Sequence, residues 1–367
     1  MDGSSFQTLP ARYYTGADVF RREMESFYFQ SWICAGRAES IPNPGDYFLR
    51  EFAGESIVVV RDRAGALRAF YNVCRHRGTR ICSAGEGSFT GRIQCPYHGW
   101  TYDFDGRLLG APHMDEPGFA REDYPLHAVS TGVWDGHLFL HLGANPEPLE
   151  RQLAELPQKF APWGMRNLRL QRRIVYEVKA NWKLVVQNYN ECLHCPLLHP
   201  ALHRLTDSLG ASNEPPAPTY IGGVMGFRGG AQTMSTDGKK RRDYLPGLSE
   251  DDRRKVCYFA IYPNLLLSLH PDYVMVHTLW PQAVDQTRIL CEWYFHPVEM
   301  AKPDFRADDA IDFWDTTNRE DWAIVELSQA GIQSRAYSPG PYSAREELLH
   351  AFDEEVLRRE RAHLKRQ

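Results

Sequence analysis

The sequence predicts an α+β protein in which a small all-β module precedes a larger region of mixed strands and helices. Between residues 46 and 142, short runs rich in β-branched and aromatic residues are separated by glycine and Asp-Gly turns. From residue 151 onward, strand-like runs alternate with segments whose apolar residues recur at helical spacing. A chain of 367 residues exceeds the usual size of one domain, so we expect two domains or one with a large insertion.

A short amphipathic helix is predicted to open the chain, over residues 18–34. Its apolar residues recur at helical spacing: Val19, Phe20, Met24, Phe27, Tyr28 and Trp32. The all-β module follows, with the clearest strands predicted at 57–61, 67–72, 93–95 and 138–142. A proline-containing stretch at 145–148 then ends the module.

The larger region is predicted to combine long strands with three helices. The strands are expected at 172–178, 256–269, 273–280 and 288–295. The helices are expected at 182–193, 307–330 and 344–361. Residues 211–251 are rich in proline, glycine and charge, which favours a long loop or lid.

Composition excludes several functional classes. The formal net charge of −5 lacks the basic excess of a nucleic-acid-binding protein, so no nucleic-acid partner is expected. No apolar run is long enough to span a bilayer, and the N-terminus lacks a signal-peptide pattern, so we expect a cytoplasmic protein with no membrane contact. Under those conditions the eight cysteines favour thiols or metal ligands over a disulfide framework.

Two matched pairs of soft ligands lie in the all-β module. Cys74 and His76 form a Cys-x-His pair, and Cys95 and His98 form a Cys-x-x-His pair, each at the end of a predicted strand. Two such loops can close on one metal centre. The four residues could bind zinc tetrahedrally, or a [2Fe–2S] cluster with thiolates on one iron and imidazoles on the other, or they could be ordinary core residues. The thiolate-then-imidazole order in both loops favours the cluster. Cys82 lies between the pairs and is expected to be an inert thiol.

At these residues the sequence resembles the Rieske family. The Cys-x-His and Cys-x-x-His pairs follow that family's box. Flanking residues match as well, namely Arg77, Gly78, Tyr97, Gly99 and Trp100.

A second group of metal-ligand types follows the first predicted helix of the larger region. Glu191 and His194 are three residues apart and are expected to share a helix face. Pro196 should bend or stop the helix and so let His199 approach the same metal. Two imidazoles and one carboxylate leave Fe(II) open to O₂ and substrate. Cys192 and Cys195 do not repeat the paired-loop order and are interpreted as structural.

The carboxylate is expected from the helix at 307–330. Helical spacing alone does not choose among its acids, Asp315, Glu320, Asp321 and Glu326. The wider resemblance to Rieske oxygenase large subunits, which carry a distant helical Asp ligand, implies that Asp321 is the third ligand. In the same family an acid at the position of Glu191 links an iron-bound histidine to a cluster histidine of the neighbouring subunit. The resemblance therefore also implies a homotrimer.

That resemblance also sets the expected domains. They are an N-terminal helical segment (1–39) packing on the catalytic domain, a Rieske [2Fe–2S] domain (40–150) and a catalytic mononuclear iron domain (151–367) of the helix-grip type. The chain has no dinucleotide fingerprint after a strand and no plant-type ferredoxin cysteine pattern. A separate NAD(P)H-dependent reductase of flavin or ferredoxin type is therefore expected to supply electrons for O₂ activation.

The substrate is expected to be a quaternary ammonium compound such as glycine betaine, carnitine or choline. Two motifs resemble those of monooxygenases of that kind: Asn190-Glu-Cys-x-His-Cys195, and Ser334-Arg-x-Tyr-x-x-Gly340 near the end of the sequence. A quaternary cation needs aromatic faces, and the candidates on predicted strands are Tyr258, Tyr262, Trp280 and Trp293. The alternatives are an aromatic-ring hydroxylase or O-demethylase of the same family, and an electron carrier that uses only the cluster.

Overall fold

The computed structural model describes residues 6–365, and its internal contacts divide the chain into two compact units. The smaller unit is Gln30–Leu149, and the larger unit comprises the chain before and after it. Residues 30–39 therefore group with the smaller unit, whereas the expected N-terminal segment ran to residue 39. None of the helices among residues 6–365 is long and apolar enough to cross a membrane.

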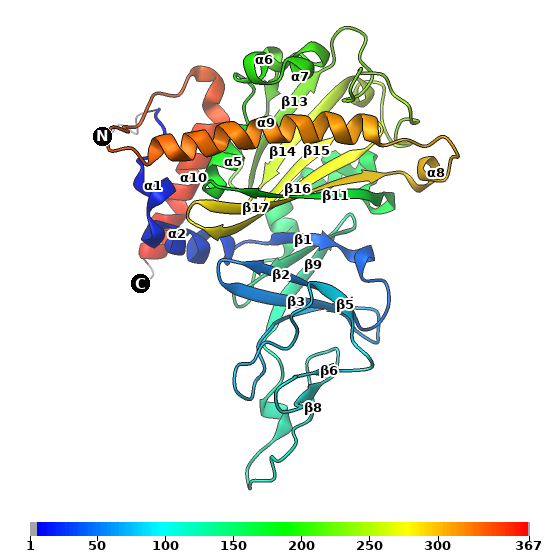
Figure 1. Cartoon of the computed structure of the whole chain (residues 1–367), viewed down its shortest axis with the longest axis vertical. Coiled ribbons are helices and arrows are strands. Elements are labelled where there is room, and N and C mark those ends of the chain that lie inside the picture. Colours follow the sequence, from blue (N-terminus) through cyan, green and yellow to red (C-terminus); the bar gives the residue numbers. More distant parts are fainter. Residues whose placement is uncertain (1–5, 366–367) are drawn as a thin grey trace. The chain divides into compact units, whose positions relative to one another are not determined.

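The smaller unit is all-β, as the sequence predicted. A seven-stranded antiparallel sheet has the order β1-β10-β9-β4-β3-β2-β5, and a three-stranded sheet has the order β6-β7-β8 (Figure 1). The strands are β1 (Ile33–Arg37), β2 (Asp46–Phe52), β3 (Glu55–Arg61), β4 (Leu67–Tyr71), β5 (Glu86–Ser88), β6 (Ile93–Gln94), β7 (Thr101–Tyr102), β8 (Leu108–Gly110), β9 (Ala128–Trp134) and β10 (His137–His141).

The larger unit is built on a second seven-stranded antiparallel sheet, with the order β11-β17-β16-β15-β14-β13-β12. Its long helix α9 runs across one face of this sheet (Figure 1). The α+β fold class is thereby confirmed. The strands are β11 (Arg169–Val178), β12 (Ser212–Asn213), β13 (Tyr220–Gly226), β14 (Lys255–Ile261), β15 (Leu265–Leu269), β16 (Val274–Ala283) and β17 (Gln286–Phe295).

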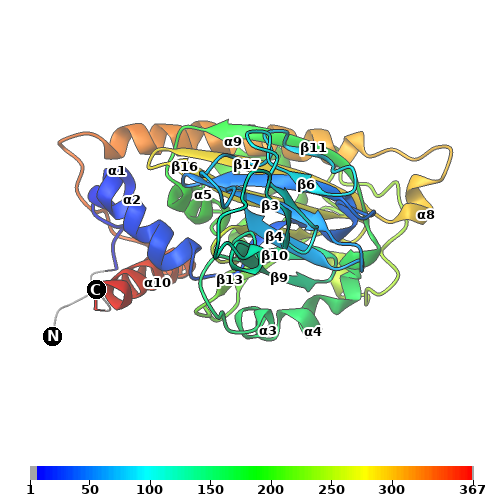
Figure 2. The same ribbon diagram turned by 90° about the horizontal axis from the view of Figure 1, so that it is seen from below.

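In the larger unit, the first helices of the described chain lie beside the last one. Helices α1 and α2 lie next to α10 in both views (Figures 1 and 2). A fully buried ion pair joins Lys183 of α5 to Glu23 of α2 at 2.7 Å. The helices are α1 (Arg12–Thr15), α2 (Ala17–Glu23), α3 (Leu149–Leu153), α4 (Leu156–Phe160), α5 (Trp182–Tyr189), α6 (Cys195–Leu198), α7 (Pro200–Leu205), α8 (Pro297–Met300), α9 (Asp308–Ile332) and α10 (Glu347–Leu364).

Two predicted elements have different bounds in the structure. The predicted helix at 18–34 ends with a π-helical turn at Met24–Tyr28, and β1 begins at Ile33. Trp32 fits the helical period but belongs to the smaller unit, where its indole N–H donates to the Glu147 carbonyl. The single strand predicted at 256–269 is two strands, β14 and β15. Pro263 lies between them, where a residue without an N–H cannot extend the strand pairing.

The predicted loop at 211–251 contains strand β13, which pairs with β14. Its glycines concealed the strand because glycine is unfavourable within strands. They are needed here for close packing: a Cβ on Gly222 would lie 2.3 Å from the Tyr258 carbonyl oxygen. The rest of the segment is anchored by Arg242, whose buried guanidinium contacts Asp272 at 2.9 Å and Asp309 at 2.6 Å. This segment therefore forms part of the sheet and its support.

Candidate metal centres

The two ligand loops of the smaller unit have the same backbone geometry. In the first, the Gly78 N–H donates to the Cys74 carbonyl and the Cys74 N–H to the Thr79 carbonyl. In the second, the Gly99 N–H donates to the Cys95 carbonyl and the Cys95 N–H to the Trp100 carbonyl. Gly78 and Gly99 have φ values of 73° and 72°, a region that favours glycine. Two equivalent loops can present equivalent ligand pairs to one centre.

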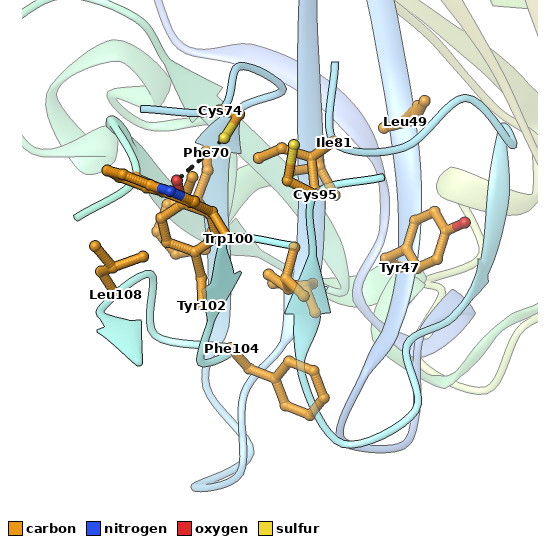
Figure 3. Close-up of a cluster of buried hydrophobic side chains, with 14 residues drawn as sticks. Tyr47, Leu49, Phe70, Cys74, Ile81, Cys95, Trp100, Tyr102, Phe104 and Leu108 are labelled. Carbon is orange, nitrogen blue, oxygen red and sulfur yellow. Dashed lines mark hydrogen bonds between the residues drawn. The ribbon is translucent and has the colours of Figure 1, made fainter. Parts of the chain in front are cut away.

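Both cysteines of these loops are buried and face one end of the unit's hydrophobic core. Figure 3 shows their sulfur atoms at the same end of the cluster that contains Trp100 and Tyr102. The Tyr102 hydroxyl lies 3.4 Å from the Cys74 sulfur and accepts a hydrogen bond from the Arg75 N–H. Burial and the neighbouring Cys74 thiol raise the pKa of Cys95. A bound metal would stabilise the thiolate form of these cysteines.

The two histidines of the loops lie together at the same end. The ring centroids of His76 and His98 are 4.7 Å apart, and His76 stacks on Trp100 at 4.9 Å. The Nδ1 atom of His76 is buried and has no hydrogen-bond partner among residues 6–365. Burial, with His76 and Arg77 nearby, lowers the pKa of His98, which keeps its imidazole neutral. Two imidazoles beside two thiols fit the mixed ligand set of a Rieske cluster.

In the larger unit, the residues that follow α5 form the second candidate site. Helix α5 begins at an Asn181 N-cap and ends at Tyr189, so the predicted helix to residue 193 is too long. Glu191 and His194 therefore lie in a short loop and do not share a helix face. Pro196 does not end a helix either: it lies in the first turn of α6, where proline is favoured because that N–H needs no partner.

Helix α6 then places His199 beside His194, and α9 supplies the carboxylate. The Nε2 atom of His199 lies 2.8 Å from Asp321 Oδ1, and that of His194 lies 3.4 Å from the same oxygen. Candidate ligand atoms of the three residues all lie within 4.8 Å of one another. Two imidazoles and a carboxylate fit the donor set of a mononuclear non-haem iron. The interior of α9 is thus the source of the candidate third ligand.

Further carboxylates face the other sides of the two imidazoles. Glu191 contacts His194 Nδ1, and Glu320 Oε2 lies 2.7 Å from His199 Nδ1. Burial lowers the pKa of His194, but hydrogen bonds to Asp321 and Glu191 outweigh burial and raise the pKa to about 9. Burial also lowers the pKa of His199, but the hydrogen bond to Asp321 outweighs burial and raises the pKa above its usual value. The acids therefore stabilise positive charge between them, as a site for a divalent cation must.

A pocket adjoins these residues, and only one of the four predicted aromatic residues lines it. Tyr258 does so, together with Tyr189, Trp314 and Met225. The other three candidates are buried among core side chains. The Tyr262 ring packs on Phe27 and Phe352, and Trp280 donates to the Thr278 hydroxyl. Trp293 is fully buried. Tyr258 and Trp293 belong to one row of paired residues across β14, β15, β16 and β17, so the strand a residue lies on, and not alternation alone, decides which aromatic side chain reaches the pocket.

Several residues near this site escaped the sequence reasoning. Asn188 donates to Asp321 Oδ1 at 3.1 Å, and Tyr189 and Trp314 line the pocket. The available signals were proximity to Glu191 for Asn188 and Tyr189, and for Trp314 a place on the same helical strip as Asp321. Cys192 and Cys195, interpreted as structural, form a disulfide on either side of His194. The other six cysteines form no disulfide in the structure.

A small β unit with paired Cys/His loops, joined in one chain to a helix-covered sheet with a two-histidine, one-carboxylate site, defines the Rieske non-haem iron oxygenases. The family model described as ring hydroxylating alpha subunit (catalytic domain) matches residues 165–361, and that of the Rieske [2Fe-2S] domain matches residues 31–130. The chain belongs to this family. It is an oxygenase subunit with a [2Fe–2S] cluster and a mononuclear iron.

The chain is also similar to individual proteins of this family. The chain is 30% identical to the glycine betaine monooxygenase oxygenase subunit of Pseudomonas aeruginosa, over 92% of this chain and 85% of the relative. It is 38% identical to the carnitine monooxygenase oxygenase subunit of Acinetobacter pittii, over 90% and 86%. A crystal structure of the quaternary ammonium Rieske monooxygenase CntA with L-carnitine superimposes with a TM-score of 0.80, at 26% identity over 100% and 97% of the two chains. Because such relatives are oxygenase subunits, a separate reductase is implied.

Proposed function

We propose that the protein is the terminal oxygenase of a system that removes an N-methyl group from a quaternary ammonium compound such as glycine betaine. The pocket beside the iron site carries the proposal, because it combines aromatic faces with carboxylates. Tyr189, Tyr258 and Trp314 can contact a methylated cation, and Asp321 and Glu191 provide negative charge. The glycine betaine and carnitine monooxygenase subunits among its relatives support the same substrate class.

The proposed cofactor ligands follow from the two sites. Cys74, His76, Cys95 and His98 would hold the cluster, and His194, His199 and Asp321 the iron. The iron supplies O₂ activation. The chain orients the substrate through its aromatic residues and fixes the two imidazoles through carboxylates. Insertion of one oxygen atom into a methyl C–H bond gives an N-hydroxymethyl group, which breaks down to formaldehyde and the tertiary amine. Two electrons and two protons reduce the second oxygen atom to water.

The electrons would come from a separate NAD(P)H-dependent reductase of flavin or ferredoxin type, in the cytoplasm. We propose a homotrimer in which Glu191 links His194 to a cluster histidine of the neighbouring subunit. Exposed apolar side chains close to Glu191, Leu193 at 38% and Leu197 at 91%, support a protein contact at this loop. Light scattering should then give a mass of about three times 42.2 kDa.

The first experiment tests both cofactors and substrate. Anaerobically purified protein should contain acid-labile sulfide equal to its cluster iron, with further iron at the mononuclear site. With a reductase and NADH, glycine betaine or carnitine should yield formaldehyde in equal amount to the O₂ consumed. The aromatic-ring hydroxylase or O-demethylase alternative predicts hydroxylated or demethylated aromatic products and no formaldehyde from betaines. Sulfide without additional iron, even after reloading with Fe(II), would support an electron carrier.

A further inference from the structure

The imidazole of His199 lies between two carboxylates that are neighbours in the sequence. Asp321 Oδ1 lies 2.8 Å from Nε2, and Glu320 Oε2 lies 2.7 Å from Nδ1. Consecutive residues of a helix project about 100° apart. Helix α9 can therefore contact both nitrogens of one ring with adjacent side chains. Glu320 has no role in the ligand set proposed above.

We propose that Glu320 is a positioning residue for the mononuclear iron. Its carboxylate accepts the Nδ1–H of His199, which fixes the tautomer whose Nε2 lone pair is directed at the metal. This inference rests on the proposed function, because it requires His199 to be an iron ligand. Glu320 is thus the counterpart, on His199, of the contact that Glu191 makes with His194.

The two glutamates are held differently. Glu191 lies in the loop after α5, and its second oxygen accepts the Leu193 N–H at 2.5 Å. Glu320 lies within α9, whose backbone is fixed by its own hydrogen bonds and by packing on the sheet. A ligand oriented from a helix is held more rigidly than one oriented from a loop. His199 is therefore the better fixed of the two imidazoles.

Burial makes the Glu320 contact more than a surface ion pair. The side chain of Glu320 is 37% exposed, but that of His199 is only 2% exposed. Water has little access to the imidazole. A buried N–H group without a partner costs about 1–3 kcal/mol. Loss of Glu320 would leave Nδ1 unpaired, or let the ring turn and weaken the bond from Nε2 to the metal.

Iron affinity tests this role independently of turnover. The Fe(II) dissociation constant would be measured anaerobically by competition with a chelator, in the complete cluster-containing protein. For Glu320→Ala we expect affinity about 10- to 100-fold weaker than wild type, the usual effect of losing a partner of a metal-bound histidine. Glu320→Gln keeps an acceptor oxygen and should lose less. Asp312→Asn, which removes the same charge from an exposed position of α9, should bind iron as wild type does.

The outcomes separate this inference from the proposed ligand set. An unchanged circular dichroism spectrum and melting temperature in every variant would show that the fold of the larger unit is intact. His199→Ala should lose most of its mononuclear iron. If it does and Glu320→Ala binds Fe(II) as tightly as wild type, the role of Glu320 is refuted while the ligand set stands. If His199→Ala retains its iron, the ligand set itself is wrong. If Asp312→Asn and Glu320→Ala lose the same amount of Fe(II) affinity, the effect comes from net charge alone, and the inference is refuted.

Discussion

Two histidines in the larger unit each meet a carboxylate on the side away from Asp321. This arrangement leaves both Nε2 atoms directed at one place, next to a pocket lined by Tyr189, Tyr258 and Trp314. The side chains that would hold the metal and those that would hold the substrate are thus adjacent. Their separate contributions can be measured one residue at a time.

Tyr258 is predicted to select for positive charge. A cation over an aromatic face gains about 0.5–2 kcal/mol, which corresponds to about a 2- to 30-fold change in affinity. Tyr258→Leu should weaken glycine betaine binding by that factor, and Tyr258→Phe should have little effect because the ring remains. The control ligand is 3,3-dimethylbutanoate, in which an uncharged quaternary carbon replaces the ammonium nitrogen and the carboxylate is kept: its affinity should hardly differ between Tyr258→Phe and Tyr258→Leu. Equal losses for both ligands in Tyr258→Leu would indicate packing and no preference for charge.

Asp353 is predicted to make stability depend on pH. Burial raises its pKa from 3.8 to about 7, although Tyr342 and Gln187 donate hydrogen bonds to it. The folded protein therefore binds an extra proton between about pH 4 and pH 7, so stability falls as pH rises through that window. The difference corresponds to on the order of 4 kcal/mol at most, since one pKa unit is worth about 1.36 kcal/mol.

Asp353→Asn isolates this effect. Its amide oxygen can accept from Gln187 and its amino group can donate to Tyr342, so the contacts survive without the charge. The melting temperatures of wild type and Asp353→Asn would be measured from about pH 5 to about pH 8. They should converge towards low pH, and the variant should melt at a higher temperature than wild type towards high pH. Parallel curves for the two proteins would contradict the prediction.

Elements far apart in the sequence form the walls of the iron site. Helix α9 supplies Asp321 and Glu320, the loop after α5 supplies His194, and β14 supplies Tyr258. Strand β13 packs closely against β14 because its glycines leave room. The position of Tyr258 therefore depends on a strand that was predicted to be a loop.

Gly222→Ala is predicted to disturb this packing. The added methyl group would lie 2.3 Å from the Tyr258 carbonyl oxygen, a backbone atom that can move only with its strand. Overpacking of this kind costs about 1–3 kcal/mol. Gly226→Ala, in the same strand, adds a methyl group with no heavy atom within 4 Å and should stay within about 0.5 kcal/mol of wild type. Thermal unfolding of both variants tests the comparison, and similar melting temperatures would argue against close packing at Gly222.

At the scale of the whole molecule, the two units hold different cofactors and must exchange electrons. Each unit has its own sheet and core, so each centre can be removed without the other. The proposed trimer routes electrons from the cluster of one chain to the iron of its neighbour. Assemblies that mix two variant chains can distinguish this route from electron transfer within one chain.

Complementation between two inactive variants is therefore predicted. His98→Ala should lack an intact cluster, and His199→Ala should lack the mononuclear iron. Each alone should be inactive in formaldehyde release. Co-expression with two different affinity tags, followed by purification on both, should give mixed assemblies with measurable activity, because a neighbouring cluster reaches an intact iron. Separately purified variants that are mixed without subunit exchange serve as the control. Inactive mixed assemblies with both cofactors present would indicate transfer within one chain.

The sequence by itself indicated the chemistry, because all the expected metal ligands except Asp321 lie in short motifs. The Cys-x-His and Cys-x-x-His pairs, and the group from Glu191 to His199, needed only local spacing and the resemblance to be identified. The all-β character of the smaller unit and most strands of the larger one also followed from local pattern.

Tertiary structure decided the rest, because contacts between distant segments have no local pattern. Helical spacing could not separate Glu320 from Asp321, yet they contact opposite nitrogens of His199. Strand β13 depends on its partner β14, and three of the four proposed aromatic residues proved to be core. The direction in which a side chain points is set by packing across the sheet. That packing brings the predicted ligand residues together into two defined centres.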